Sequence, residues 1–212
     1  MNESFTNLEC AIREAVCGFS SARLSQLSGC VRVDPSRPIP GISTGADRWA
    51  FRVGVSFEGI ALDLHCHYSE STARALAEMT GGRGDSDDVE TWHSFIGEYC
   101  NLIGGAVENC ISGAFRKQGL SAGGQLQLPV KELSGDAGRG VGKPSSAWYL
   151  ELPSGHELIF LAWIRVSDQD LEEQGVVPGS LALDIEQTFE QHAGMTEGDA
   201  LDALMQEAID LL

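Results

Sequence analysis

Residues 88–115 read DVETWHSFIGEYCNLIGGAVENCISGAF, a stretch in which apolar side chains recur at intervals of three and four. An α-helix advances about 100° per residue, so this spacing gathers the apolar side chains on one side of a helix. They are Trp92, Ile96, Tyr99, Ile103, Ala106 and Cys110. The stretch therefore predicts a long amphipathic helix whose apolar side packs on the rest of the fold.

A row of polar residues lies on the opposite side of this predicted helix. Ser94, Glu98 and Asn101 are four and three positions apart, so they follow one another along a single helix face. Gly105 continues the row by one turn and leaves bare backbone that a partner could approach closely. Every amphipathic helix presents a polar face to water, so the spacing allows either a functional site or an ordinary solvated surface. Asn is an unfavourable residue in the interior of a helix, so its presence at position 101 favours a functional role for Asn101.

Upstream of this helix, the sequence predicts a β-hairpin between two helices. Residues 49–57 and 60–68 both alternate in side-chain character with a period of two, which is typical of half-buried strands. Glu58-Gly59 between them suits a tight turn. Apolar residues at helical spacing predict a helix over residues 5–27, and a shorter helix is expected over residues 70–80.

Downstream, three further strands are expected, over residues 125–130, 147–152 and 157–166. Pro129 cannot donate to a strand ladder, so the first of them is expected at a sheet edge or strand end. Two helices are expected at about 181–192 and 197–212. This mixed order predicts an α+β fold: an antiparallel sheet with long helices packed on one face. We assign residues 1–167 to this domain and residues 168–212 to an acidic helical C-terminal extension.

Composition excludes several functional classes. The 212 residues carry a formal net charge of −17, which argues against nucleic-acid binding through a basic face. Residues 168–212 hold twelve acids and no Lys or Arg, typical of a solvated acidic face. No apolar run approaches the length of a membrane span, and no secretion signal precedes the first helix, so a cytoplasmic location with reduced cysteines is expected.

Asp63, His65 and His67 alternate along one face of a predicted strand, within reach of a shared metal ion. Carboxylate and imidazole groups are suitable zinc ligands, but no fourth ligand is evident in the sequence. The polar side of an ordinary strand gives the same pattern. We therefore assign no metal site to this chain.

The order Ser94-x₃-Glu98-x₂-Asn101, followed by Gly104-Gly105 and later by Pro129, resembles the signature of the CheC/CheX/FliY phosphatases of bacterial chemotaxis. The resemblance covers roughly residues 5–166 and includes the order of helices and strands. A single copy of the motif is most similar to CheX. The stretch between Asn101 and Pro129 is longer than the usual gap of the family.

The resemblance implies a CheC/CheX-like fold and removal of phosphate from the aspartyl phosphate of a CheY-like response-regulator receiver domain. Asn101 would position the attacking water, Glu98 would dock to a lysine of the receiver, and Ser94 would support Glu98. Gly105 and Pro129 would contact the partner. Mg²⁺ is expected in the receiver, so no cofactor is expected here, and a homodimer is implied. The alternative is a non-catalytic module that binds receivers or serves as a flagellar-switch-type scaffold.

Overall fold

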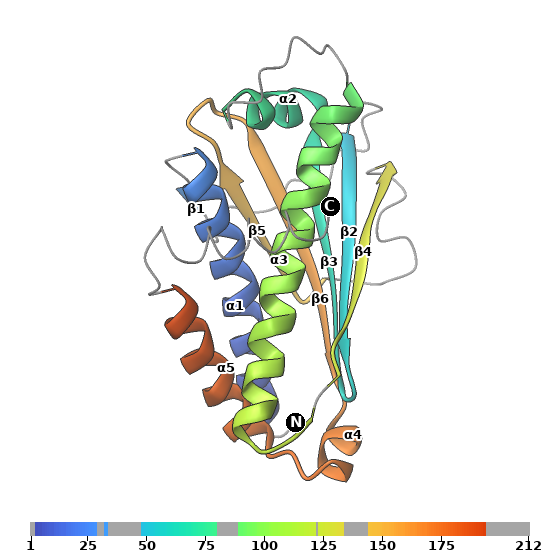
Figure 1. Ribbon diagram of the computed structural model, residues 1–212, viewed down its shortest axis with the longest axis vertical. Coiled ribbons are helices and arrows are strands. Elements are labelled where there is room, and N and C mark those ends of the chain that lie inside the picture. The colour runs from blue at the N-terminus through green and yellow to red at the C-terminus, as the bar shows by residue number, and fades with distance from the viewer. Residues whose placement is uncertain are drawn as a thin grey trace, which may run out of the picture.

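The computed structural model describes residues 3–28, 32–33, 48–79, 89–121, 123–133 and 144–193. These residues form six strands and five helices (Figure 1). In chain order they are α1 (Glu3–Ser28), β1 (Arg32–Val33), β2 (Arg48–Phe57), β3 (Ile60–Ser69), α2 (Glu70–Met79), α3 (Val89–Lys117), β4 (Gln125–Leu133), β5 (Ser146–Glu151), β6 (Glu157–Val166), α4 (Asp168–Glu173) and α5 (Pro178–Ala193).

The strands make one antiparallel sheet in the order β1-β5-β6-β3-β2-β4. The predicted hairpin is confirmed, because β2 and β3 pair along their full length. Gly59 in the turn has a positive φ, a conformation that favours glycine. β4 ends the sheet order, so the expectation that the strand containing Pro129 lies at an edge is also confirmed. The helices α1 and α3 cross the same face of the sheet, as Figure 1 shows, and the α+β class is as predicted.

The long helix α3 is continuous and ends at Lys117, two residues before a glycine. Gly119 has a φ of 75°. Its N–H donates to the carbonyl of Arg116 at 3.0 Å, and the N–H of Leu120 donates to the carbonyl of Phe115 at 3.1 Å. This pair of bonds is the Schellman arrangement, which satisfies carbonyls that the helix end leaves without partners. The double glycine Gly104-Gly105 does not interrupt the helix.

Two glycines let α3 lie close to the sheet. A Cβ added to Gly97 would be 3.0 Å from the ring of Phe51 on β2. A Cβ added to Gly104 would be 2.9 Å from Val53 Cγ2 on β2 and 2.8 Å from Leu126 Cδ1 on β4. These distances are shorter than ordinary van der Waals contacts. The sequence places the two glycines two turns apart on the same helix face, and they bring α3 onto β2 and β4.

The helices after β6 pack onto the same core. The rings of Phe19 on α1 and Phe189 on α5 meet edge to face with centroids 5.1 Å apart, and Cys110 Sγ on α3 donates to the carbonyl of Ile185 at 3.6 Å. Ile185 is fully buried. The tail thus folds back on the domain as far as Ala193. The helix α4 was not predicted, and the helix predicted at 197–212 lies outside the described residues.

One buried serine connects three elements. The hydroxyl of Ser20 on α1 accepts a hydrogen bond of 3.0 Å from Trp148 Nε1 on β5, and its carbonyl accepts one of 2.7 Å from the Tyr99 hydroxyl on α3. The Ser20 hydroxyl itself donates to the carbonyl of Cys17 at 2.8 Å. All polar atoms named here have partners, as buried polar groups require. The contact fixes α3 relative to α1 and the sheet.

None of the described helices combines the length and apolar character needed to cross a membrane. Five cysteines fall among the described residues, and all are free thiols: Cys10, Cys17, Cys66, Cys100 and Cys110. The last three are buried.

Candidate functional site

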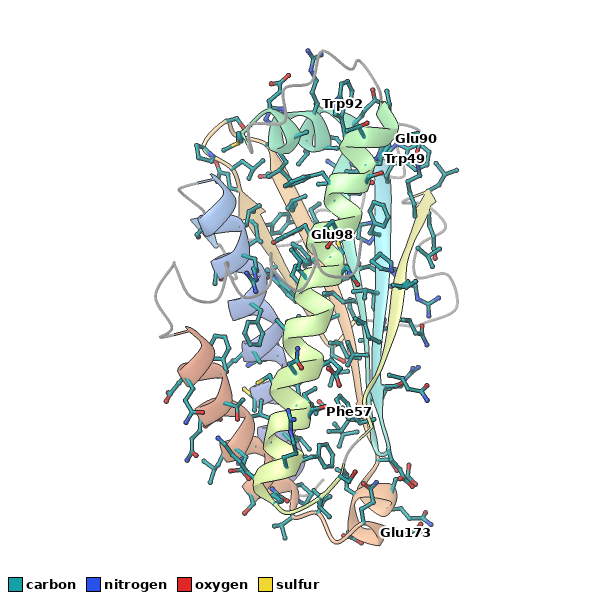
Figure 2. All side chains as sticks on the ribbon, in the orientation of Figure 1. Trp49, Phe57, Glu90, Trp92, Glu98 and Glu173 are labelled. Carbon is teal, nitrogen blue, oxygen red and sulfur yellow. The ribbon has the colours of Figure 1, made fainter. Side chains whose placement is uncertain are left out.

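An open groove of about 430 Å³ runs between α3 and the edge strand β4. Phe51 of β2 lines it between these two walls. The wall formed by α3 carries Glu90, His93, Ser94, Gly97, Glu98 and Asn101, and the wall formed by β4 carries Leu128, Pro129 and Lys131. Figure 2 shows Glu90 near one end of α3 and Glu98 farther along the same half of the helix.

The groove brings together four of the five residues that the sequence singles out. Ser94, Glu98 and Asn101 line one wall, and Pro129 lines the other. Gly105 does not line the groove, and a Cβ added there would meet no atom within 4 Å. The bare backbone expected at Gly105 is therefore present, one turn beyond the groove. What these residues do for a partner stays a prediction.

A β-bulge lies at Pro129, in the wall of the groove that β4 forms. Arg52 of β2 lies opposite Val130, but Gly54 lies opposite Gln127. Two residues of β4, Leu128 and Pro129, therefore face the single residue Val53 of β2. A bulge bends its strand and re-aims side chains, and bulges are frequent at sheet edges and beside functional sites. Pro129 has no N–H to lose at this irregular position.

Asn101 carries an unused hydrogen-bond acceptor. Its amide oxygen Oδ1 is buried and accepts no hydrogen bond from any described residue. Leaving a buried polar atom without a partner costs about 1–3 kcal/mol. Asn101 lines the groove, so a turn of its side chain would bring this oxygen to a hydrogen-bond donor there and remove the penalty. The side chain is therefore suited to hold a water molecule or a partner's N–H.

Glu98 and Ser94 are exposed on the same wall. The Ser94 hydroxyl donates to the carbonyl of Glu90 at 2.8 Å, a bond within its own helix. The predicted support of Glu98 by Ser94 is therefore not a hydrogen bond donated by this hydroxyl. Because the Glu98 carboxylate is exposed, a cationic side chain of another molecule can reach it.

An ion pair connects the two walls at one end of the groove. Lys131 Nζ on β4 lies 2.9 Å and 2.7 Å from the two carboxylate oxygens of Glu90 on α3. The same ammonium lies 5.2 Å from the ring centroid of Trp49 on β2, within the range of a cation–π contact. The pair is a bridge between α3 and the edge strand, and it marks the end of the groove remote from Asn101.

A buried imidazole lies behind this ion pair. The Tyr68 hydroxyl is 2.8 Å from His93 Nδ1, and the ring of Trp49 meets the imidazole at a centroid distance of 5.0 Å. Burial lowers the pKa of His93, and the Lys131 cation adds to this shift against the opposing carboxylates of Glu90 and Glu70. Burial also raises the pKa of Tyr68, so the phenol stays protonated, and the tautomer of His93 decides which of the two groups donates. His93 is thus a neutral groove residue.

Sequence reasoning missed most of the other groove residues, among them Phe51, His93, Leu128 and Lys131. The sequence holds two signals that could have identified some of these residues. His93 and Gly97 lie four apart and continue to Asn101 at the same spacing, so the helical period places them in one row. Lys131 is a lone cation shortly after Pro129 on an edge strand. Phe51 gave no signal, because only the assembled sheet places it beneath the helix.

The suspected metal ligands Asp63, His65 and His67 lie on β3, where Asp63 already has a hydrogen-bond partner. Arg52 Nε donates to Asp63 Oδ1 at 2.8 Å, and His65 Nε2 lies 3.3 Å from the same oxygen. Burial alone would raise the pKa of Asp63, but its interactions with His65 and Arg52 bring it below its usual value. The imidazole of His65 also packs on Trp163 at a centroid distance of 4.6 Å. Among the described residues no cluster of three or more metal-ligating side chains occurs.

Comparison with solved structures defines the class of fold. The antiparallel sheet with its helices on one face is the fold of the chemotaxis protein CheX, as the resemblance implies. The chemotaxis protein CheX of Desulfovibrio desulfuricans matches 73% of this chain and 99% of its own with a TM-score of 0.50 and 18% identity. No family model and no curated protein matches the sequence.

Two other solved structures are similar. The CheX of Borrelia burgdorferi, solved in complex with CheY, BeF₃ and Mg²⁺, matches 72% of this chain and 96% of its own with a TM-score of 0.49 and 17% identity. A CheC-like superfamily protein from Shewanella sp. PV-4 matches 78% of this chain and 99% of its own, with a TM-score of 0.48 and 15% identity. At such identities the likeness is one of fold.

Proposed function

We propose that this protein is a phosphatase that hydrolyses the aspartyl phosphate of a CheY-like response-regulator receiver domain in chemotaxis signalling. The observation that carries the proposal is the unpartnered, buried amide oxygen of Asn101 in a groove that also holds Glu98 and Pro129. These are residues of the sequence motif, and the fold is that of the chemotaxis proteins which the motif resembles. The proposal also covers the role of each residue.

Asn101 would enter the receiver's active site and accept a hydrogen bond from the attacking water. Phosphoryl transfer passes through a loose transition state, so positioning the water contributes more than covalent chemistry. The water oxygen bonds to phosphorus as the bond from phosphorus to the aspartyl oxygen breaks. The bonding electrons leave with the carboxylate, and both hydrogens of the water leave with the phosphate. The receiver supplies the Mg²⁺ that neutralises charge in this step.

Glu98 would pair with the cationic side chain of a receiver lysine. A contact of this kind is charge-assisted and stronger than a neutral hydrogen bond, so it can fix the orientation in which the two proteins dock. Glu98 lies one turn before Asn101 on a continuous helix, which holds the two side chains in a constant relation. Docking through Glu98 therefore also aims Asn101.

The proposal is tested with purified receiver domains of the host, each phosphorylated with acetyl phosphate. Wild-type protein should accelerate phosphate release from its cognate receiver. Asn101→Ala should lower the rate by about 10²–10³, by analogy with removing one oxyanion donor. The same variant should be at least as stable as wild type, because Ala is a better helix former than Asn. In addition, the amide oxygen that it removes has no partner.

Asn109→Ala is the matched control, since Asn109 is an exposed asparagine on the same helix outside the groove. It should keep the wild-type rate. Equal rates for wild type and Asn101→Ala would overturn the mechanism. Binding of phosphorylated receiver with no acceleration of its decay would instead identify a non-catalytic receiver-binding or flagellar-switch-type scaffold module.

We extend the proposal to assembly and location. A homodimer and a cytoplasmic location follow from the resemblance to chemotaxis proteins, and a receiver-dependent activity needs contact with cytoplasmic signalling. Light scattering during size-exclusion chromatography tests the oligomeric state directly. Cell fractionation tests the location.

A further inference from the structure

Exposed apolar side chains concentrate on the edge strand β4. Six large hydrophobic residues are exposed in the described parts of the chain, and four of them are on this strand: Leu126, Leu128, Val130 and Leu133. The other two, Val177 and Leu183, follow β6 in the C-terminal region. Exposed apolar side chains that gather on one strand beside a groove mark an interaction surface more often than scattered single residues do.

Leu128 is the most exposed of the six, with 75% of its surface accessible. It occupies the β-bulge together with Pro129, and both line the groove opposite Asn101 and Glu98. The bulge is what turns an edge-strand leucine to the rim of the groove rather than into the core. An aliphatic side chain held in water at this position gains free energy as soon as another surface covers it.

The charged, polar and apolar groups of the groove indicate which kind of partner surface fits it. Glu98 is an exposed anion in a chain with a net charge of −17, and Asn101 offers an unfilled acceptor, while Leu128, Pro129 and Phe51 are apolar. A matching surface presents a cation toward Glu98, a hydrogen-bond donor toward Asn101 and an aliphatic or aromatic side chain toward Leu128. A second copy of this acidic chain is the poorer match, because like charges repel.

We propose that Leu128 is the apolar anchor of the surface that binds the receiver domain, resting on the function proposed above. The receiver contributes an apolar side chain beside the lysine that pairs with Glu98, and this side chain packs on Leu128 and Pro129. Leu128 thus determines affinity for the partner, and Asn101 determines the rate of the chemical step. The division follows from their chemistry, because an apolar side chain contributes packing alone, whereas an amide oxygen can accept a hydrogen bond from the attacking water.

The test is the dependence of dephosphorylation rate on receiver concentration, with the cognate receiver phosphorylated by acetyl phosphate. Leu128→Ser should raise KM by about 10- to 100-fold and keep kcat, since the contact is equally present before and during the reaction. Leu183→Ser is the matched control, because Leu183 is 58% exposed on α5 and outside the groove. It should leave both constants unchanged.

The outcomes separate this inference from the proposed function. If wild type is active and Leu128→Ser has the wild-type KM, the anchor is wrong and the phosphatase stands. If Leu128→Ser converts a dimer to a monomer while Leu183→Ser does not, β4 is a contact between copies and the inference is overturned. If wild type accelerates no receiver, the proposed function fails and the anchor fails with it. Circular dichroism melting of both variants shows that each is folded.

Discussion

Asn101 illustrates at the scale of one residue how function opposes stability. Its amide is a poor helix former and its buried oxygen has no partner, so each property lowers the stability of the free protein. The penalty disappears when the side chain turns this oxygen toward a donor in the groove. A residue retained against its own folding preference is a better indicator of function than an exposed polar residue with no such penalty.

His67 makes stability depend on pH. Burial, with smaller contributions from His65 and Arg48, lowers the pKa of this imidazole from 6.5 to about 4. Between these values the unfolded chain binds a proton that the folded chain does not, so stability falls as pH drops from about 6.5 toward 4. The effect reaches up to about 3 kcal/mol, because one pKa unit corresponds to about 1.4 kcal/mol.

Denaturant unfolding at a series of pH values measures this loss. His67→Gln should flatten the curve in that interval, although His93 retains a contribution of the same sign because its pKa is also lowered. Parallel curves for the variant and wild type would show that His67 is not the group responsible. Below about pH 4 the imidazole is charged in both the folded and the unfolded chain, so the contribution of His67 no longer changes.

The element scale shows what a sequence can predict and what it cannot. Periodicity located α1, β2, β3 and α3, because burial on one face imposes a repeat that any single sequence carries. No repeat in the sequence signals the bulge in β4, because the bulge depends on the register in which β4 pairs with β2. The helix α4 was missed because six residues are too short for a helical period to register. The wall of the groove on α3 was therefore predictable, but of the opposite wall only Pro129 and Lys131 carried a signal in the sequence.

The two neighbouring glycines of α3 have opposite roles. The Cβ that Gly104→Ala adds would overlap Val53 and Leu126, whereas the Cβ of Gly105→Ala meets no atom within 4 Å. Gly104→Ala should therefore lower the free energy of unfolding by about 1–3 kcal/mol, the usual cost of overpacking a core, less what helix propensity returns. Gly105→Ala should raise it by up to about 1 kcal/mol, because Ala is the better helix former.

Chemical denaturation of the two variants side by side gives the comparison. Equal effects would mean that the packing of α3 on β2 is looser than the structure indicates. A loss of receiver binding by Gly105→Ala without loss of stability would support its predicted place in the partner contact.

At the scale of the whole molecule, the acidic tail is part of the core as far as it is described. Its helix α5 packs along α1 and α3 and contributes fully buried side chains. The high proportion of acids in residues 168–212 suggested a solvated face, and the exposed side of α5 agrees with that. The apolar side of the same helix packs against α1 in the core, and the net charge of the segment gives no indication of this packing.

Ile185 and Leu183 lie two positions apart on α5, but Ile185 is fully buried and Leu183 is exposed. Ile185→Ala should lower the free energy of unfolding by about 2–5 kcal/mol, because its loss leaves a cavity in the core. Leu183→Ala should leave that free energy nearly unchanged, as substitutions of exposed residues usually do. Thermal melts of the two proteins provide the measurement. Similar shifts for both would show that α5 is peripheral to the folding unit.

The hydrogen bond from Tyr99 to Ser20 has a consequence for binding thermodynamics. Tyr99 lies directly after Glu98 and two residues before Asn101, so the turn that bears the groove residues is the turn fastened to α1 and, through Trp148, to β5. Its backbone entropy is lost when the chain folds and not when a partner arrives. Association should then resemble rigid-body docking, with a heat-capacity change that corresponds to the contact area alone and contains no folding contribution.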